Sequence, residues 1–388
     1  MGTIFAMELG FSDEQRLLAE MVQQLCADQF PLERLRAVEN SPAGYCPALW
    51  RQIGALGLTG LNIAPDAGGL GLGLLETALV YEAFGRHLVP SPHFTSAVLA
   101  ARLLAASTDS AVVRDWLGRI ASGETVVAVA IAGSDDDLVA TPVADGYRLD
   151  GTLSFVPFAG AADALLARAR CTTSGAAMAL LLPAGLAGLH TARQQLLGSE
   201  PHYRVSCAGV IAEAGHRLSL PDVAGAWRDA QLLGCIPQAA QAVGAARRVH
   251  EISVAYAKER HAFGRPIGGF QALAHDLAEA AVAIEGCQTL TLQAAWLHDA
   301  DRDWQAVAAM AKLQAGAMFR RVSMLAIQVH GGIGYTIEAD PQLFFRRAKQ
   351  WQLLNGSPEV LEDHIARLTL PAASPGATVA GTREFAHV

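Results

Sequence analysis

The sequence predicts an α+β protein in which helices come first, strands follow and helices return. Three observations lead to this fold class. Apolar residues follow helical spacing near the N-terminus, short alternating segments separated by Gly, Pro and Asp occupy the middle, and long helical spacing dominates the C-terminal part. We therefore expect an N-terminal helical domain (1–120), a middle β domain (121–222), a C-terminal four-helix bundle (223–370) and a flexible tail (371–388).

The N-terminal part contains three predicted helices. Ser12 is a suitable N-cap for the first of them, and Asp13 follows in the first turn, where the helix dipole favours acidic side chains. Residues 50–56 and 76–88 show the same helical spacing. The glycine-rich segment APDAGGLGLG (64–73) between them is expected to form a loop.

The middle part reads as short strands. Four of its segments either alternate apolar and polar residues or form brief apolar runs, and Gly, Pro or Asp separates them: TVVAVAIAG, GYRLDGTLSFV, DALLARAR and AMALLLP. Short strands with turn signals at such intervals predict a sandwich or a barrel-like β domain.

The C-terminal part has the strongest helical signal. In segment 270–296 the expected buried stripe takes spacings of four and three residues, at positions 273, 277, 280, 284, 287 and 291. Segments 235–259 and 304–329 are of comparable length. Their Ala and Gly content would let helix backbones approach closely, as in a four-helix bundle.

The composition excludes several classes of protein. Of the 388 residues 52% are apolar, which suffices for a core shared by two or three domains. A net charge of −8 without a dense run of Lys or Arg argues against nucleic-acid binding. The six cysteines form no CxxC pair, so no metal site and no disulfide framework are expected. The opening MGTIFAMELG lacks the basic region of a signal peptide and no apolar run reaches the length of a membrane span, so we expect a cytoplasmic protein.

The segment RHAFGRPIGGFQ (260–271) joins two predicted long helices and offers groups that bind an anion. Arg260 supplies a planar cation suited to a pyrophosphate. Phe263 and Ile267 provide an apolar wall, and Gln271 offers an amide to a nucleobase or ribose. An interhelical turn with a surface arginine fits the same residues, so this segment alone leaves both interpretations open.

A second segment, QVHGGIGY (328–335), ends another predicted helix. Gln328 precedes Gly331 and Gly332, whose backbone N–H groups can approach a phosphate. An ordinary helix C-cap is the alternative. No strand leads into the segment, so it is not a Rossmann fingerprint, and His330 is expected to be a packed or hydrogen-bonded side chain.

A third segment, QLLNGSPEVLEDHIARL (352–368), reads as a loop that opens an amphipathic helix. Together the three segments resemble the acyl-CoA dehydrogenase family: RHAFGRPIGGFQ resembles its arginine–phenylalanine–glutamine motif, and QVHGGIGY resembles its glutamine–glycine–glycine motif. The stretch from Ala64 to Pro92 resembles the family's first-domain signature, in Pro65, Gly68, Gly69, Glu82 and Gly85. The resemblance extends from about Phe11 to Leu368 in the family's order and spacing.

The resemblance implies the three-part fold described above, usually assembled as a dimer of dimers, with FAD bound across a subunit interface. It implies that one set of residues holds the pyrophosphate and adenine side of the neighbour's FAD: Arg260, Phe263, Ile267, Gln271, Gln328, Gly331 and Gly332. The flavin ring is expected against the middle domain of the same subunit, near Ser134, Phe155 and Ser357. In this family a glutamate takes the α-proton of an acyl-CoA while the β-hydrogen leaves as hydride to the flavin.

This sequence departs from the family at the residues that carry the chemistry. Asn355 occupies the position of the glutamate, and an amide oxygen accepts hydrogen bonds but is barely basic. Some relatives place the base on an earlier helix, and that position falls at Gly234. Phe155 and Pro157 replace a tryptophan and a threonine that normally face the ring, and Pro157 has no backbone N–H. The acidic turn 135–137 is expected to be solvated rather than to bind a cation.

We therefore expect the chain to be the base-lacking subunit of a hetero-oligomeric acyl-CoA dehydrogenase, with a homologous second subunit that carries the glutamate. A homo-oligomer remains an alternative, slowly active if Glu359, Glu362 or Asp363 acts as the base. Two further alternatives are a flavin-dependent oxygenase or oxidase on the same fold and a non-catalytic scaffolding subunit.

Overall fold

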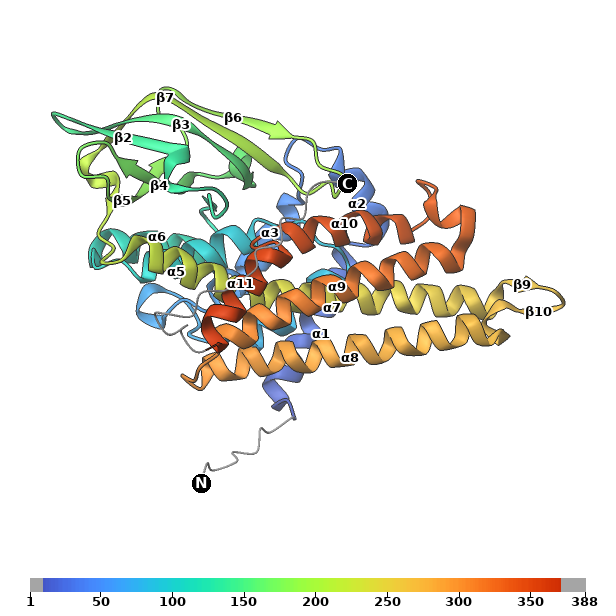
Figure 1. The fold of residues 1–388 in the computed structure, drawn as a ribbon. Coiled ribbons are helices and arrows are strands. Elements are labelled where there is room, and N and C mark those ends of the chain that lie inside the picture. Colours follow the sequence, from blue (N-terminus) through green and yellow to red (C-terminus); the bar gives the residue numbers. More distant parts are fainter. Residues whose placement is uncertain (1–9, 371–388) are drawn as a thin grey trace, which may run out of the picture.

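The computed structural model describes residues 10–370, so the predicted flexible tail (371–388) and the opening residues lie outside the described part. Helices come first, a mixed sheet follows and long helices complete the chain, as the sequence predicts (Figure 1). The positions of the domain boundaries at 120, 222 and 370 stay a prediction. No helix within residues 10–370 is long and apolar enough to cross a membrane.

The N-terminal part consists of short helices. Ser12 caps the first one through a capping box, because Gln15 N donates to Ser12 Oγ at 3.2 Å and Ser12 N donates to Gln15 Oε1 at 3.0 Å. A π-helix at Phe94–Ala100 was not predicted, and such helices often occur at functional sites. The α-helices are α1 (Asp13–Gln29), α2 (Leu32–Glu39), α3 (Pro47–Ala55), α4 (Leu74–Arg86), α5 (Ala101–Ala105) and α6 (Ser110–Ala121).

The middle part is one connected sheet of eight strands in the order β6-β7-β3-β2-β4-β5-β8, with β1 paired to β4. Strand β4 shows why both faces are apolar: Leu165 and Ala167 belong to one hydrophobic cluster and Leu166 to the cluster on the other face. The strands are β1 (Val127–Val129), β2 (Leu138–Val143), β3 (Gly146–Pro157), β4 (Ala164–Cys171), β5 (Ala177–Pro183), β6 (Leu189–Gln194), β7 (His202–Glu213) and β8 (Arg217–Leu218).

The C-terminal part is built on three long helices. Of the stripe predicted for α8, Leu277, Ala280, Ile284, Cys287 and Thr291 are buried, and the residue at position 273 is half-buried. The helices are α7 (Val223–Glu259), α8 (Gln271–Asp299), α9 (Gln305–His330), α10 (Pro341–Leu353) and α11 (Pro358–Thr369). Between α7 and α8 a hairpin of β9 (His261–Ala262) and β10 (Arg265–Pro266) projects from the end of the bundle away from the sheet (Figure 1).

Two glycines set the contact between α4 and α7. A Cβ atom at Gly85 would lie 1.9 Å from Gln241 O, and one at Gly244 would lie 1.9 Å from Glu82 O. Any side chain there would therefore push the two helices apart. This close approach places the aromatic residues of α4 beside the glutamines of α7.

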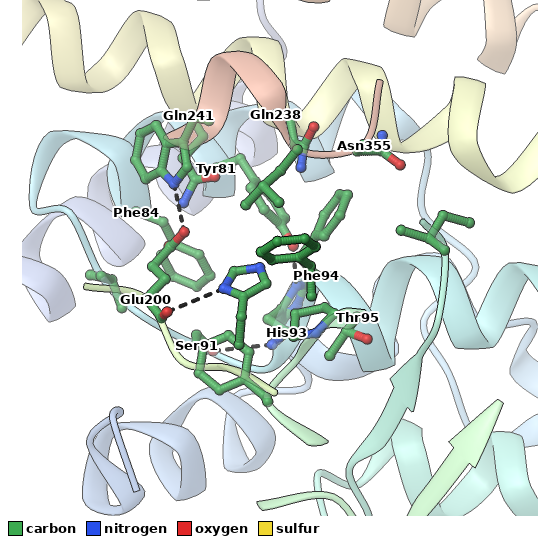
Figure 2. A pocket seen from close by; sticks show the side chains of 18 of the residues that line it. Tyr81, Phe84, Ser91, His93, Phe94, Thr95, Glu200, Gln238, Gln241 and Asn355 are labelled. Atoms are coloured by element: carbon green, nitrogen blue, oxygen red, sulfur yellow. Dashed lines mark hydrogen bonds between the residues drawn. The ribbon is translucent and has the colours of Figure 1, made fainter. Parts of the chain in front are cut away.

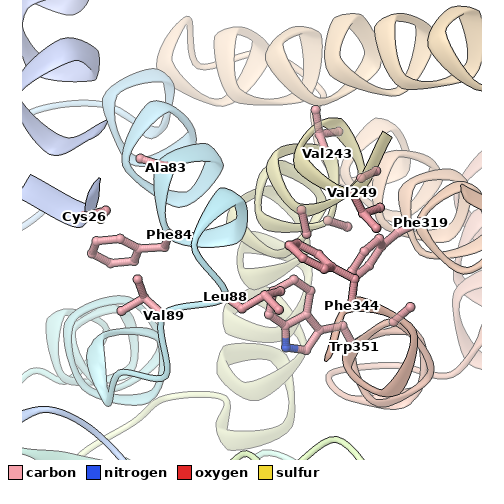
Figure 3. Close-up of a cluster of buried hydrophobic side chains, with 14 of the residues drawn as sticks. Cys26, Ala83, Phe84, Leu88, Val89, Val243, Val249, Phe319, Phe344 and Trp351 are labelled. Atoms are coloured by element: carbon pink, nitrogen blue, oxygen red, sulfur yellow. The ribbon is translucent and has the colours of Figure 1, made fainter. Parts of the chain in front are cut away.

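The N-terminal helices and the long helices share one hydrophobic core (Figure 3). Phe84 and Leu88, at the end of α4 and just after it, belong to the same cluster as Val243 of α7, Phe319 of α9 and Phe344 of α10. Burying each such side chain contributes roughly 1.5–3 kcal/mol to the free energy of unfolding. The two helical parts are thus stabilised together rather than separately.

Candidate functional site

Two adjoining cavities lie where the sheet meets the helices. The larger has a volume of about 700 Å³ and the smaller a volume of about 70 Å³. Both are lined by Ile131, Ala132 and Phe155 from the sheet side, and by Leu354 and Asn355 from the loop between α10 and α11. The loop that stood out in the sequence therefore forms a wall common to both cavities.

The larger cavity combines an aromatic ring with positive charge. A register shift in β3 places Phe155 at φ 57°, where its backbone N–H donates to Gln194 Oε1 at 2.8 Å and its side chain stays 46% exposed. Arg168, Arg346 and Lys349 also line this cavity, and its described lining residues include no carboxylate. A planar, anionic ligand fits such a lining.

The two serines of the predicted ring site differ in position. Ser357 lines the larger cavity as the N-cap of α11. Ser134 is absent from the described lining of both cavities: its N–H donates to Asp137 Oδ2 at 2.8 Å, and its hydroxyl accepts from Asp136 N at 3.3 Å. Asp136 is also ion-paired with Arg170. No group of three or more potential metal ligands occurs among the described residues.

The smaller cavity has aromatic walls and polar groups on two sides. In Figure 2, Gln238, Gln241 and Asn355 lie along one side, while Glu200 and His93 lie along the other. The aromatic side chains that line it are Tyr81, Phe84, Phe94, Phe155, Phe158 and Trp351. Pro157 belongs to the same lining and has no backbone N–H to donate.

Asn355 is held in an unusual conformation between the two cavities. Its φ of 57° lies in the left-handed region, which asparagine tolerates better than most side chains. The side chain is buried, and its Nδ2 donates to Gln231 O at 2.9 Å, which fixes the orientation of the amide. Its Oδ1 is buried and finds no hydrogen-bond partner within residues 10–370. The group offered to a ligand is therefore an acceptor, not a base.

The two positions expected for a base meet in space. A Cβ atom at Gly234 would lie 3.1 Å from Asn355 Nδ2, 3.0 Å from a ring atom of Phe94 and 3.0 Å from a methyl group of Leu99. The two positions are therefore neighbours, and a side chain at Gly234 would require Phe94, Leu99 or Asn355 to shift. The sequence provides an amide at one position and no side chain at the other.

Other carboxylates do not compensate. Glu359, Glu362 and Asp363 are exposed on α11, and none of them is among the described residues that line the cavities. Glu200 does line the smaller cavity, but its two oxygens are engaged: Arg347 lies 2.9 Å from Oε1, and Trp351 Nε1 donates to Oε2 at 2.8 Å. Glu200 is thus an ion-pair partner rather than a free proton acceptor.

A buried ion-pair network holds the walls of the site together. Arg347 on α10 is 1% exposed and lies between Glu200 of the segment before β7 and Glu39 at the end of α2, with the second contact at 3.7 Å. Its neighbour Arg346 pairs with Glu39 at 3.0 Å and donates to Ser199 Oγ at 2.5 Å. The network connects the N-terminal helices, the sheet and α10 around the smaller cavity.

Two buried histidines of the smaller cavity were not predicted from the sequence. Burial lowers the pKa of His93 to about 4, and its two ring nitrogens contact Tyr81 Oη and Leu58 O, each at 2.9 Å. Burial also lowers the pKa of His202, whose Nδ1 lies 3.1 Å from Glu200 O. The same Nδ1 lies 3.3 Å from Gln350 Nε2. Both rings are neutral near pH 7, and no motif or spacing in the sequence marks them.

The residues predicted to hold a dinucleotide gather at the opposite end of α7. Arg260, Phe263 and Gln271 are exposed on or beside the β9–β10 hairpin, and Phe263 is 95% exposed. Gln328, Gly331 and Gly332 are exposed at the end of α9. Ile267 is half-buried beneath them in a cluster with Leu277 and Val329. His330 stacks on Tyr256 with ring centroids 4.2 Å apart, so it is a packed histidine, as predicted.

The two groups of residues are too far apart to contact one FAD molecule within a single chain. Arg260 follows Gly234 by 26 residues on and at the end of α7, about 39 Å at roughly 1.5 Å per residue. That separation exceeds the reach of an extended dinucleotide. Figure 1 shows the hairpin and the sheet at opposite ends of the long helices.

Comparisons with known proteins show that the chain is similar to acyl-CoA dehydrogenases. A family model described as acyl-CoA dehydrogenase, N-terminal domain, matches residues 12–124, and one described as acyl-CoA dehydrogenase, C-terminal domain, matches residues 233–370. The chain is 31% identical to acyl-CoA dehydrogenase FadE27 of Mycobacterium tuberculosis over 84% of this chain and 88% of that protein. It is 32% identical to acyl-CoA dehydrogenase IpdE2 of the same organism over 90% of this chain and 95% of that protein.

A solved structure shares the fold over almost the whole chain. The structure of the ChsE4–ChsE5 complex from Mycobacterium tuberculosis contains a chain that matches with a TM-score of 0.86 and 27% identity. The match covers 95% of this chain and 100% of that one.

Proposed function

The chain belongs to the acyl-CoA dehydrogenase family and is an FAD-dependent oxidoreductase, and from this we propose that it serves as the base-lacking subunit of a hetero-oligomeric acyl-CoA dehydrogenase. One observation carries the proposal. Asn355 and Gly234 are the two positions at which the family resemblance places a base, they lie side by side, and neither has a carboxylate.

The missing carboxylate decides what the chain's own residues can do. Dehydrogenation of an acyl-CoA requires removal of the α-proton, while FAD, when bound, accepts the β-hydrogen as hydride. The Oδ1 atom of Asn355 can accept a hydrogen bond but cannot hold that proton at neutral pH. We assign the proton-accepting carboxylate to the homologous partner subunit, with an acyl-CoA as the substrate.

The larger cavity suits the ring end of the cofactor. Its aromatic side chain, Phe155, can stack on a planar ring, and its arginine and lysine side chains suit an anion. Ser357 offers a hydroxyl at the same wall. Pro157, which lines the smaller cavity, offers no backbone N–H to the ring.

The exposed end of α7 supports a role in a second subunit's cofactor site. Arg260, Gln271 and Gln328 are exposed on this chain and lie far from the two cavities in which its own residues could hold a flavin ring. Apolar side chains surround them on the same end of the molecule, with Ile333 57%, Tyr335 65% and Ile337 75% exposed. A subunit that covers this surface would remove it from water and bring its FAD to Arg260.

A hetero-oligomer also agrees with the kind of structure that this chain is similar to. The structure of the ChsE4–ChsE5 complex contains two different proteins, as its name states. Assembly with identical copies is the alternative arrangement. We propose the cytoplasm as the compartment, which the six unpaired and buried cysteines support.

Purification of the chain alone tests the proposal. We expect little bound flavin in the visible spectrum and no dehydrogenation of acyl-CoA substrates, because both the neighbour's motif and the base are missing. Full FAD occupancy with rapid acyl-CoA dehydrogenation by the lone chain would contradict it. Oxygen consumption by the reduced protein without any acyl-CoA would instead indicate a flavin-dependent oxygenase or oxidase.

A further inference from the structure

We propose that the smaller cavity of this chain binds a compact acyl group that carries a hydroxyl, rather than a plain aliphatic chain. The inference rests on the proposed function only for the thioester to which that group is attached. It gives the chain's own site a binding role although the site has no base.

The size of the cavity limits the group. Its volume of about 70 Å³ is less than half of the roughly 150 Å³ of an apolar cavity that admits benzene. Tyr81 and Phe84 of α4 and Phe94 of the π-helix line it, and the Tyr81 ring contacts both others, with centroids 5.6 Å from Phe84 and 6.4 Å from Phe94. A group of a few heavy atoms fits without displacing these side chains.

Two oxygen atoms at the cavity lack hydrogen bonds. Asn355 Oδ1 and Gln238 Oε1 are both buried, and neither has a partner among the described residues. The orientation of the Asn355 amide is fixed, because its Nδ2 donates to Gln231 O at 2.9 Å. Buried polar atoms in native proteins are nearly always paired, so these two acceptors at a cavity call for a donor from outside the chain, which a water supplies in the empty site and a ligand hydroxyl replaces on binding.

The two oxygens border one space. Gln238 follows Gly234 by four residues on α7, so both positions lie on the same face of the helix. Phe94, Leu99 and Asn355 pack closely around Gly234, where a Cβ atom would lie 3.0–3.1 Å from an atom of each, so the open space is the cavity that Gln238 and Asn355 both line. Figure 2 shows Gln238 and Asn355 on the same side of the cavity. A single hydroxyl-bearing carbon chain can therefore reach both residues.

The charges around the site favour a neutral donor over an ammonium group. Glu200 is the one carboxylate among the described residues that line the two cavities, and Arg347 and Trp351 already occupy it. Arg346 and Lys349 line the adjoining cavity. An ammonium group would meet positive charge without an available counter-ion, whereas a hydroxyl meets no such penalty.

Titration calorimetry with three short thioesters tests the inference: butyryl-CoA, 3-hydroxybutyryl-CoA and 3-aminobutyryl-CoA. We expect the hydroxylated thioester to bind about tenfold more tightly than butyryl-CoA, as one additional buried hydrogen bond allows, and the amino compound to bind more weakly. Equal or weaker binding of the hydroxylated compound, tighter binding of the amino compound, or no binding of any of them would overturn the inference.

Matched variants on α7 locate the effect. Gln238→Met should abolish the preference for the hydroxyl, whereas Gln241→Met, which alters a glutamine of the same lining without an unpaired buried oxygen, should keep it. Without ligand, Gln238→Met should also raise the Tm, because it replaces an unpaired buried oxygen by an apolar group. An unchanged preference in Gln238→Met would contradict the assignment. These readouts need no turnover, so they stay separate from a failure of the dehydrogenase proposal.

Discussion

The two ends of α7 differ in their functional side chains and in how deeply these side chains are buried. Around Gly234 the site is enclosed, and a buried ion-pair network ties its walls to all three parts of the chain. Around Arg260 the binding groups are exposed on a hairpin and a helix end. The enclosed end has no carboxylate at Asn355 or Gly234, while the exposed end presents Arg260, Gln271 and Gln328 away from both cavities.

This difference teaches where the function of each end lies. The proposed role of Arg260 and its exposed neighbours is to bind FAD that another subunit holds. The proposed role of the residues around the enclosed cavity is to bind a ligand rather than to accept a proton. The following changes separate these two roles, in order of decreasing expected effect.

The largest effect should come from placing a carboxylate in the enclosed end. In the assembled protein, with the partner's own carboxylate replaced by an amide, Asn355→Glu should raise the rate of acyl-CoA-dependent dye reduction by about 10²–10⁴, the usual contribution of a general base. Asn355→Gln is the control, because it has the same length without basicity. No rise in a variant whose visible spectrum shows bound flavin would mean that the enclosed end has lost more than its base.

The second effect concerns the network that holds the enclosed end. Arg347→Met leaves Glu200 buried without its cation, so we expect the free energy of unfolding to fall by about 3–5 kcal/mol in urea denaturation. Arg346→Met changes a more exposed arginine and should cost about 1 kcal/mol or less. Similar small losses for both variants would show that the buried pair does not hold the site together.

The third effect concerns the exposed end. Arg260→Ala should weaken FAD retention in the assembled protein by roughly ten- to a hundredfold, the range expected for one charge-assisted hydrogen bond. The Tm of the lone chain should not change, because Arg260 is exposed. Arg265→Ala is the matched control, since that guanidinium lies over the Phe270 ring at 4.1 Å. Equal loss of FAD in both variants would contradict a specific role of Arg260.

The smallest effect is the pH dependence of stability at the enclosed end. Burial lowers the pKa of His93 from 6.5 to about 4, so the unfolded chain binds a proton in this range while the folded chain does not. The contribution of His93 to stability is therefore complete well above pH 6.5 and declines as the pH falls towards 4, by about 1.4 kcal/mol at pH 5.5. Burial also lowers the pKa of His87 and of His202, which adds to the decline in the same direction. Denaturant unfolding at pH 7.5 and pH 5.5 measures it. His93→Gln should reduce the difference, and an identical difference in that variant would assign it to other groups.

Much of the fold follows from local patterns that the sequence displays. The N-cap Ser12 and the stripe of α8 from Leu277 to Thr291 are determined by neighbours a few positions away, which is why the sequence predicts them. The π-helix at Phe94–Ala100 was missed because no local rule distinguishes it from an α-helix. Its residues contact the sheet and α7, so the distinction arises from tertiary packing.

The candidate site was predicted only in part, for the same physical reason. Spacing from the motifs located Asn355 and Gly234, but their contact depends on packing of a loop against α7, 121 positions earlier in the chain. The pairing of Glu39 with Arg346 joins residues still further apart. Gln238 and His202 carry no motif, and only their burial at a cavity marks them.

The hydrogen bond from Asn355 to Gln231 O has a chemical consequence for the purified protein. Asparagine followed by glycine, as at Asn355 and Gly356, is a sequence prone to spontaneous deamidation, and asparagine is among the thermolabile residues. Burial and the bond to Gln231 restrain the attack of the following nitrogen on the side-chain carbonyl. In an old or heated preparation that loses this restraint, a fraction of the protein would carry a carboxylate in place of the Asn355 amide. Intact-mass analysis should therefore accompany any trace of activity found in the lone chain.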